Sequence, residues 1–425
     1  MIQSFSKINK VSGTLSLPGD KSISHRALLI SSLAKGVSSI VNLPDSEDIK
    51  STIHCLKSLG IKIETSGDKT FVYGRGFKGY SPPSGTLKAG NSGTTARLLS
   101  GILAAQNFES VIEGDASLST RPMKRILEPL ILMGSTIRSS DGKLPIKIYP
   151  AANLKSVNYE LPIASAQVKS AILLAGLHLE DESSVIESVY TRNHTENLLD
   201  LSVKREEGKI TSISSRKNYP EPKEYFIPGD ISSAMCFIVL TLLSKNSELM
   251  LNNVSLNPSR IESTNLLKRM GGNIQIEING ESNNELYGDM LVKSSELSNV
   301  KIDPEIISLI MDEIPILAVA GIFSEGVFEV RGAYELRVKE SDRIKSLISN
   351  FHLLGLDSEE YEDGFRISGE IKKSNYTFNS FGDHRIAMAF AILSSLLQEG
   401  GKVEGFESVA ISNPDFLDQI NSIAR

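Results

Sequence analysis

The sequence predicts an α/β (α+β) protein of two similar domains, each made of three repeated helix-plus-strand units with buried parallel helices. One reason is that a short loop of Gly, Asp, Ser or Asn leads into an apolar helix pattern six times along the chain. A second is the pattern Pro-Gly-Asp-x-Ser, which begins at Pro18 and again at Pro228. A repeat after about half the chain indicates duplicated halves. The third is that the intervening segments are short, partly alternating and rich in β-branched or aromatic residues, as strands are.

The helix patterns are almost wholly apolar, which predicts that the helices are buried. The first begins near Lys21, because Pro18 and Gly19 end the segment before it. The others cover residues 96–105, 168–177, 234–243, 316–323 and 386–397. Strands are expected within residues 62–73, 147–149, 273–278, 326–331 and 364–367. If the helices pack in parallel, their amino ends meet on one face of each domain, and two facing domains form one cleft that attracts small anions.

Composition narrows the class of protein. The 425 residues are too many for one core, and 40% hydrophobic with 23% charged residues is typical of globular proteins. The formal net charge of -6 argues against a nucleic-acid-binding surface. Residues 1–10 lack the apolar core of a signal peptide, and no apolar stretch is long enough to cross a membrane, so we expect a cytoplasmic location. Cys55 and Cys236 are expected in the core, and no His, Cys and Asp cluster has the spacing of a zinc site.

Polar and basic residues gather at the starts of these helices. Lys21, Ser22 and Arg26 fall in the first turns of the first helix, where N–H groups and the helix dipole favour a phosphate or carboxylate. Similar clusters occur at residues 90–97, 119–123, 337–343 and 382–385. Each cluster alone is also explained by a capped helix or a solvated charged face. Arginine recurs in all of them, however, and its fork suits phosphate and carboxylate oxygens, so the set favours an anion-binding site.

Asp312 differs from these clusters because it is a carboxylate followed by an apolar run. We expect it to head the helix at residues 316–323 as a cap. The apolar residues after it would partly desolvate the carboxyl group and raise its pKa, as a general acid or base requires.

Several catalytic frameworks are excluded. A Walker A loop needs adjacent Gly and Lys, and Asp20 separates Gly19 from Lys21. No G-x-S-x-G elbow occurs, and no G-x-G-x-x-G motif follows a strand pattern. The kinase, dinucleotide-binding and serine-hydrolase interpretations are therefore weak.

Together the motifs closely resemble the 3-phosphoshikimate 1-carboxyvinyltransferase family, also called the EPSP synthases, of the enolpyruvyl transferase fold. The matching stretches are residues 19–26, 90–94, 121–123, 165–167, 312–315, 337–343 and 382–385. They occur in the order and spacing of the family over nearly the full chain. The resemblance implies an enolpyruvyl transferase inside-out barrel in two domains. Residues 20–227 would form the first domain, and residues 1–19 and 228–425 the second.

The resemblance also implies an activity. The enzyme would transfer the enolpyruvyl group of phosphoenolpyruvate to the 5-hydroxyl of shikimate 3-phosphate and release phosphate, a step of chorismate and aromatic amino acid biosynthesis. Its partners would be these two small molecules, without a metal, an organic cofactor, nucleic acid or membrane, and the enzyme would be a monomer.

The family's site residues carry over onto matching positions of this sequence. Those implied for shikimate 3-phosphate are Lys21, Ser22, Arg26, Ser165, Ala166, Gln167, Asp312 and Lys339. Those implied for phosphoenolpyruvate are Lys21, Asn91, Gly93, Arg121, Gln167, Arg343 and Arg385. Asp312 would be the base near the hydroxyl and Glu340 the proton donor to carbon, while Lys21 and the arginines would offset the charge of two phosphates and two carboxylates.

This chain departs from the family pattern in three places. Ala166 stands where some members have a second serine, so only its backbone would contribute. Residues 411–414 lack the lysine that the family often carries near the carboxyl end. Arg192 matches a substrate-side position only loosely. Gly93, in contrast, matches a position whose enlargement is associated with glyphosate resistance, so a glyphosate-sensitive enzyme is expected.

The sequence leaves two alternative functions open. The first is the enolpyruvyl transferase that acts on UDP-N-acetylglucosamine, which typically relies on a loop cysteine, whereas Cys55 and Cys236 fall in helix patterns. The second is a catalytically silent anion-binding homologue. The presence of Lys21, Asp312 and Glu340 together argues against it, because binding alone does not need both carboxylates.

Overall fold

The computed structural model describes residues 1–151, 153–372 and 376–425, and the chain divides into two compact units. Unit 1 comprises Met1–Pro18, Pro228–Gly280 and Leu286–Arg425. Unit 2 comprises Gly19–Ile227 and Glu281–Glu285. Each unit is described below by itself.

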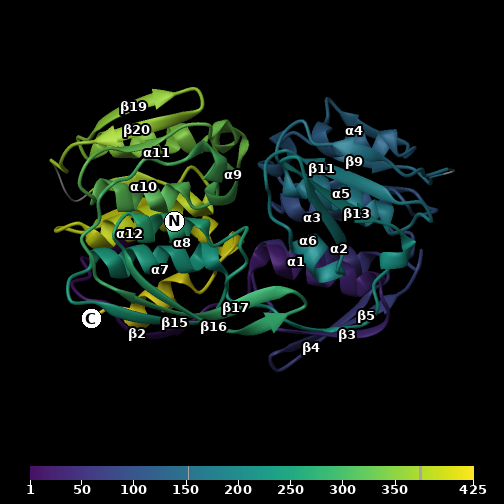
Figure 1. Ribbon diagram of the computed structural model, residues 1–425, viewed down its shortest axis with the longest axis horizontal. Coiled ribbons are helices and arrows are strands. Elements are labelled where there is room, and N and C mark those ends of the chain that lie inside the picture. The colour runs from purple at the N-terminus through teal and green to yellow at the C-terminus, as the bar shows by residue number, and fades with distance from the viewer. Residues whose placement is uncertain (152, 373–375) are drawn as a thin grey trace. The chain divides into compact units, whose positions relative to one another are not determined.

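Unit 2 repeats one order of elements three times: a buried helix, a strand, a second helix and two more strands. The first repeat is α1 (Lys21–Leu33), β3 (Lys35–Val41), α2 (Glu47–Ser58), β4 (Lys62–Ser66) and β5 (Lys69–Arg75). The second is α3 (Gly93–Leu103), β7 (Ser110–Glu113), α4 (Lys124–Leu132), β8 (Ile137–Ser140) and β9 (Lys143–Ile148). The third is α5 (Ala166–Gly176), β11 (Ser183–Glu187), α6 (His194–Leu199), β12 (Ser202–Glu206) and β13 (Lys209–Ser214). Figure 1 labels most of these elements.

Unit 1 follows the same order in its first two repeats, and among the described residues its third repeat lacks the last two strands. Its first repeat is α7 (Ile231–Leu243), β15 (Glu248–Ser255), α8 (Glu262–Arg269), β16 (Asn273–Ser282) and β17 (Glu285–Lys293). The second is α10 (Ile314–Ile322), β18 (Phe328–Val330), α11 (Arg343–Leu353), β19 (Asp357–Tyr361) and β20 (Gly364–Ser368), preceded by the short α9 (Ile307–Ile310). The third is α12 (His384–Leu396), β22 (Gly401–Glu404) and α13 (Phe416–Ile423).

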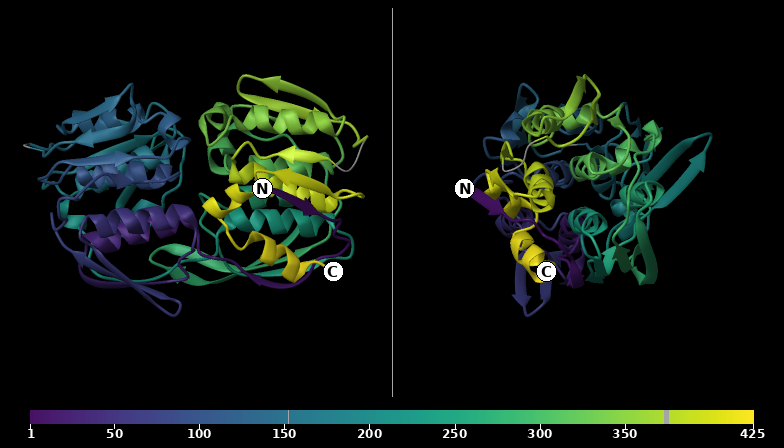
Figure 2. Two further views of the ribbon diagram at one scale, coloured as in Figure 1. Left: turned by 180° about the vertical axis from the view of Figure 1, so that it is seen from behind. Right: turned by 90° about the vertical axis from the view of Figure 1, so that its left-hand side faces the viewer.

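Each repeat carries its own sheet. In unit 2 the orders are β14-β3-β5-β4, β6-β7-β9-β8 and β10-β11-β13-β12, with β6 (Leu87–Lys88), β10 (Asn158–Glu160) and β14 (Glu224–Phe226) as added edge strands. In each sheet the added strand runs parallel to its neighbour and the other pairs are antiparallel. In unit 1 the orders are β16-β17-β15-β2, β18-β20-β19 and β1-β22-β21, with β1 (Ile2–Phe5), β2 (Ser12–Ser16) and β21 (Thr377–Asn379). Figure 2 shows the purple first strand beside the yellow carboxyl-terminal part of the chain, where β1 pairs with β22.

The repeated Pro-Gly-Asp pattern marks two of the places where the chain passes from one unit to the other, and the other two flank residues 281–285. β2 precedes α1 of unit 2 but pairs with β15 of unit 1, while β14 precedes α7 of unit 1 but pairs with β3 of unit 2. The N–H of Gly19 donates to the Asn42 carbonyl at 3.1 Å. A Cβ at Gly19 would lie 2.2 Å from that oxygen, so this crossing needs glycine.

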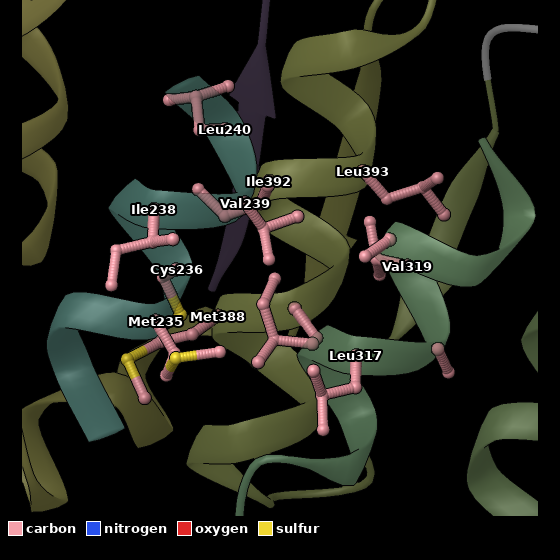
Figure 3. Packing of buried hydrophobic residues seen from close by; sticks show 14 of the residues in the cluster. Met235, Cys236, Ile238, Val239, Leu240, Leu317, Val319, Met388, Ile392 and Leu393 are labelled. Carbon is pink, nitrogen blue, oxygen red and sulfur yellow. The ribbon is translucent and has the colours of Figure 1, made fainter. Parts of the chain in front are cut away.

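The core of each unit is built on its three apolar helices. In unit 1, α7, α10 and α12 contact one another, and Figure 3 shows side chains of these helices gathered together, among them Met235, Leu317 and Ile392. In unit 2, α3 packs on α5 and contacts α1. The predicted burial is therefore confirmed, and Cys55 and Cys236 are buried as expected.

The amino ends of the buried helices converge within each unit. In unit 2, Thr94 near the start of α3 accepts a hydrogen bond from Gln167 near the start of α5 at 3.0 Å, and Arg26 of α1 donates to Ser170 of α5 at 2.8 Å. In unit 1, Ser232 of α7 donates to Glu313, the N-cap residue of α10. The expected clustering of positive helix ends is thus present in each unit.

The predicted elements agree with the structure in most respects. All six expected helices form, and the expected strand at residues 62–73 is a hairpin of β4 and β5. Helices that the sequence pattern does not indicate, such as α2, α6 and α8, are the second helices of their repeats. In the described part of the chain, none of the helices has the length and hydropathy needed to cross a membrane.

The buried His178 predicts a pH dependence of stability. Its ring packs against Phe77 and Tyr219, and burial, with minor help from nearby cations, lowers its pKa to about 4. The unfolded chain keeps a value near 6.5 and therefore takes up this proton first, so stability falls as the pH drops. We expect this residue to cost about 2 kcal/mol of unfolding free energy between pH 7 and pH 5.

Urea unfolding of the parent protein and the His178→Gln variant at pH 7, 6 and 5 measures this cost. The variant should lose less stability over this range. His25, whose pKa burial also lowers, is present in both proteins and cancels in the difference. The same pH slope in both proteins would contradict the prediction.

Candidate active site

The first turn of α1 lies within a network of buried polar groups in unit 2. Asp20 is the N-cap, and its side chain accepts from the Ile23 N–H at 2.9 Å. Lys21 follows, and its Nζ lies 2.9 Å from Oδ2 of Asp48 in α2. The exposed fractions of these two side chains are 16% and 8%, so the pair is largely shielded from water. The structure thus gives Lys21 a carboxylate partner that its own motif does not contain.

Arg26 occupies the second turn of α1 and is 3% exposed. Its Nε donates to Oγ1 of Thr195 at 2.8 Å, one terminal nitrogen to the Ser22 carbonyl at 2.9 Å and the other to Oγ of Ser170 at 2.8 Å. A guanidinium carries five N–H groups, so two remain, one on each terminal nitrogen. Arg26 can therefore bind an oxygen-bearing ligand without releasing a protein contact.

Gln167 is held between the starts of α3 and α5. Its Nε2 donates to Thr94, while its Oε1 accepts from Arg97 at 2.6 Å. Ser165 is the N-cap of α5, with its oxygen accepting from the Val168 N–H at 3.4 Å, and Ala166 is the first residue of the helix. The hydroxyl hydrogen of Ser165 and the first N–H groups of α5 have no partner inside the helix, as an anion site requires.

Asn91 and Arg121 form a second group at the start of α3. The Asn91 side chain donates to Asp115 at 2.8 Å and accepts from Arg121 at 2.7 Å. Arg121 is 6% exposed and also donates to Ser117 at 3.2 Å. Gly93 is the first residue of α3, directly after its N-cap Ser92. The polar helix start expected at residues 90–97 is therefore present, and the structure places Arg121 beside it.

Arg343 is the centre of the unit 1 site. It is the first residue of α11, is 1% exposed, and is bound by three carboxylates. Nε lies 2.8 Å from Asp383, NH1 lies 3.2 Å from Asp312 and NH2 lies 2.7 Å from Glu340. Burial alone would lower the pKa of Arg343, but Asp383, Glu340 and Asp312 together outweigh it and raise that pKa. One arginine thus holds both carboxylates that the family resemblance names as catalytic.

The structure corrects the expected role of Asp312 as a helix cap. The N-cap residue of α10 is Glu313, and Pro315 allows the helix to begin at Ile314. The Asp312 carboxylate instead pairs with Arg343 and, at 3.3 Å, with Lys339. Its side chain is 16% exposed, which agrees with the expected partial desolvation.

Lys339 and Arg385 flank this centre. Lys339 follows directly after the 3-10 helix Tyr334–Val338, and its Nζ reaches Asp312. The N–H of Arg385 donates to the N-cap residue Asp383 at 2.8 Å, which joins the start of α12 to Arg343. Apart from this backbone bond, Arg385 makes no hydrogen bond or ion pair to the residues that the structure describes. Its guanidinium remains available to a ligand.

Several polar partners at these sites are not among the candidate site residues from the sequence. In unit 1, Arg260 and Ser232 both bind the buried Glu313, the neighbour of Asp312, with the Arg260 guanidinium 3.3 Å from that carboxylate. The others are Asp48 beside Lys21, Arg97 beside Gln167, Asp115 beside Asn91 and Asp383 beside Arg343. Arg97, Ser232, Glu313 and Asp383 lie in stretches that the sequence indicates, whereas Asp48, Asp115 and Arg260 do not. The remaining residues lack a local signal because their partners are distant along the chain.

The chain resembles known proteins along nearly its whole length. The family model for EPSP synthase (3-phosphoshikimate 1-carboxyvinyltransferase) matches residues 5–420. The protein of Petrotoga mobilis named 3-phosphoshikimate 1-carboxyvinyltransferase is 46% identical to this chain over 420 residues, with 97% of each chain covered. The protein of Salinibacter ruber with the same name is 41% identical over 428 residues, with 100% of each chain covered. The solved EPSP synthase of Acinetobacter baumannii is 37% identical, with a TM-score of 0.86 over 100% of this chain and 98% of that one. The enolpyruvyl transferase NikO of Streptomyces tendae is 15% identical with a TM-score of 0.75 over 99% and 97%, which shows a shared fold.

Proposed function

Because the chain belongs to the EPSP synthase family, we propose that the polar sites of its two units act together as one active site. The enzyme transfers the enolpyruvyl group of phosphoenolpyruvate to the 5-hydroxyl of shikimate 3-phosphate and releases phosphate. Transfer to UDP-N-acetylglucosamine is not favoured by this membership. We further propose that each unit corresponds to one of the two domains of the fold, with the site residues assigned as follows.

Shikimate 3-phosphate is assigned mainly to unit 2. Lys21, Ser22 and Arg26 would bind it from α1, and Ser165, the Ala166 N–H and Gln167 from the start of α5. Charge and hydrogen-bonding capacity support this, because Arg26 retains two N–H groups and Ser165 a hydroxyl hydrogen. Asp312 and Lys339 would complete the site from unit 1, with Lys339 offsetting negative charge near the base.

Phosphoenolpyruvate is assigned to both units. Lys21, Asn91, Gly93, Arg121 and Gln167 would contact it from unit 2, and Arg343 and Arg385 from unit 1. Arg343 makes four hydrogen bonds to Asp383, Asp312 and Glu340, so one of its five N–H groups remains on NH1 for a ligand oxygen. Arg385 can offer its whole fork to a carboxylate.

The reaction requires that the 5-hydroxyl of shikimate 3-phosphate lose a proton and that C3 of phosphoenolpyruvate gain one. The 5-hydroxyl oxygen would attack C2 of phosphoenolpyruvate and pass its proton to Asp312, while Glu340 protonates C3 and turns the methylene into a methyl group. Elimination then breaks the bond between C2 and the phosphate oxygen, and the departing phosphate takes up the proton held by Asp312. The methyl group loses a proton to Glu340, and the double bond re-forms. The observation that carries this proposal is that Arg343 holds Asp312 and Glu340 on its two terminal nitrogens.

An assay of phosphate release with both substrates tests the assignment. We expect Glu340→Gln and Asp312→Asn each to lower kcat by roughly 10²- to 10⁴-fold, the usual contribution of a positioned acid or base, while both substrates still bind. Glu325→Gln, an exposed carboxylate of the same unit, is the control and should keep the parental rate. Parental kcat in both site variants would refute the acid and base roles.

The lack of space around Gly93 predicts how a substitution there changes inhibition of the enzyme by glyphosate. A Cβ at this position would lie 2.9 Å from NH1 of Arg97, the nitrogen that holds Gln167. Gly93→Ala should therefore displace Arg97 and loosen Gln167, and we expect the KM for phosphoenolpyruvate and the glyphosate concentration for half inhibition to rise about tenfold, the loss of one charged hydrogen bond.

Gly85→Ala is the matched control, because a Cβ there meets no atom within 4 Å. Steady-state rates over a range of glyphosate concentrations measure both variants and the parent. Full activity of the parent with glyphosate well above the phosphoenolpyruvate concentration would contradict the predicted sensitivity.

The oligomeric state, location and cofactor requirement of the enzyme are proposals as well. We infer a cytoplasmic monomer that works without a metal or organic cofactor, since acid, base and charge compensation are supplied by its own side chains. Light scattering should give the mass of one chain, and turnover should survive dialysis against a chelator.

A further inference from the structure

The environment of Arg26 points to residues that act on the reaction through it. The three hydrogen bonds of its buried guanidinium all go to neutral oxygens, on Thr195, Ser22 and Ser170. Among the described residues Arg26 forms no ion pair. Burial lowers the pKa of Arg26 to about 10, and the charge of Glu196 offsets only part of that effect. Such a group is costly to bury and gains most from an anionic ligand, provided that it is held in the orientation that meets the ligand.

The hydroxyl groups around Arg26 have only one consistent arrangement of hydrogens. Oγ of Ser170 lies 2.7 Å from the Ala166 carbonyl, which can only accept, so Ser170 donates its single hydrogen there. The 2.7 Å contact between Ser170 and Thr195 must then use the Thr195 hydrogen. Thr195 consequently accepts from Nε of Arg26 while donating to Ser170, which accepts from the same arginine. This relay ends at Ala166, the first residue of the helix that carries the proposed contacts to shikimate 3-phosphate.

The turn that carries Thr195 is itself fixed. Thr195 is the second residue of α6, and its neighbour His194 lies with Nδ1 2.9 Å from Oε1 of Glu285, both side chains being fully buried. Asn197, one turn later, donates to the same carboxylate at 3.2 Å and to the Asn284 carbonyl at 2.9 Å. Glu285 belongs to the Glu281–Glu285 segment of unit 2. The Thr195 hydroxyl is therefore held from both sides, by the α6 turn and by Ser170.

We propose that Thr195 is a positioning residue of this enzyme, which with Ser170 orients Arg26 toward shikimate 3-phosphate. The inference rests on the proposed assignment of Arg26 to that substrate. Thr195 fixes Nε, and Ser22 and Ser170 each fix one terminal nitrogen, so the two remaining N–H groups keep a defined direction. Loss of the Thr195 hydroxyl leaves the side-chain volume intact but lets the guanidinium rotate about its last bonds.

The test compares Thr195→Val, which keeps the shape and removes the hydroxyl, with Thr195→Ser, which restores it. We expect Thr195→Val to raise the KM for shikimate 3-phosphate about tenfold to a hundredfold, the effect of one hydrogen bond to a charged group, and to leave the KM for phosphoenolpyruvate within about twofold. Thr195→Ser should recover most of the affinity. Ser170→Ala should reproduce the selective effect in a second variant.

A matched control separates positioning from general damage. Thr191→Val removes a nearby buried hydroxyl that donates to Glu187 and does not contact Arg26. It should leave the KM for shikimate 3-phosphate at the parental value, whatever it does to the melting temperature. Equal increases of both KM values in Thr195→Val, or no rescue by Thr195→Ser, would overturn the proposal.

Arg26→Lys distinguishes failure of this inference from failure of the site assignment. If Arg26 binds shikimate 3-phosphate, Arg26→Lys raises its KM, and adding Thr195→Val to that background causes little further change, because both variants remove one interaction. An unchanged KM in Arg26→Lys refutes the site assignment. A raised KM in Arg26→Lys with an additive effect of Thr195→Val refutes the positioning role alone.

Discussion

Replacing Arg343 with methionine is expected to lower kcat/KM by at least about 10³-fold, the upper range for loss of one preorganised charge contact. The effect is large because the variant loses the last free N–H of Arg343 and an arginine partner of both carboxylates that we propose as base and proton donor. It also leaves Asp383, which is fully buried, beside two other carboxylates without the guanidinium that balances them. Removing one partner of a buried ion pair typically lowers the free energy of unfolding by roughly 3 to 5 kcal/mol. Urea unfolding and initial rates measure both effects.

Two further variants show which part of the loss concerns catalysis. Arg343→Lys keeps the charge but loses the fork, so part of the stability should return while kcat/KM stays low. Arg331→Met removes a half-exposed arginine of the same unit that pairs with Asp363, and should retain the parental kcat/KM. Recovery of full activity in Arg343→Lys would show that geometry at this arginine is unimportant.

Replacing Lys169 with methionine is expected to cause the largest loss of stability in unit 2. Lys169 is fully buried, with Nζ 2.6 Å from Glu187 and 2.7 Å from Glu196. Burial would lower the pKa of Lys169, but the two carboxylates outweigh it and raise that pKa. Without the ammonium group two buried carboxylates face each other, and we expect a loss of roughly 3 to 5 kcal/mol. Chemical unfolding at pH 8 measures it.

The pH dependence of that loss identifies its cause. Burial already raises the pKa of Glu187, and removal of Lys169 raises it further, so the folded variant binds a proton at a pH where the unfolded chain does not. The deficit should therefore shrink as the pH falls from 8 toward 5. Lys209→Met, which removes an exposed ion pair with Glu160 at 2.8 Å, should unfold like the parent at every pH. A pH-independent deficit would point to packing instead of charge.

Local sequence was sufficient to predict where the buried helices begin. A capping side chain and the apolar run it precedes lie within a few residues, and Asp20, Ser92, Ser165, Asp230 and Asp383 all cap helices in the structure. Asp312 was the exception. Its carboxylate is drawn to Lys339 and Arg343, cations 27 and 31 positions later, and a capping pattern contains no information about such distant charges.

The family motifs predicted which residues gather at the helix starts, but not what holds them there. Arg26 and Thr195 are 169 positions apart, and Arg343 and Asp383 are 40 apart. Thr195 and Asp48 have no unusual local context, since a threonine or an aspartate near a helix start is usually explained by capping. Their roles follow from the packing of three repeats around one set of helix ends, which sequence periodicity does not specify. Whether the two units bind one ligand together remains a prediction.

The exchange of strands at the two Pro-Gly-Asp crossings sets an order for synthesis on the ribosome. β2 cannot enter its sheet until β15 has been made, about 230 residues later, a delay of roughly 10 to 50 s at ordinary elongation rates. β1 waits for β22, close to the end of the chain. All strands of the three unit 2 sheets have been made before β15, so these sheets can form while the first 18 residues are still unpaired. Proteolytic loss of those residues from the nascent chain would strip an edge strand from two sheets of unit 1 and leave every sheet of unit 2 complete.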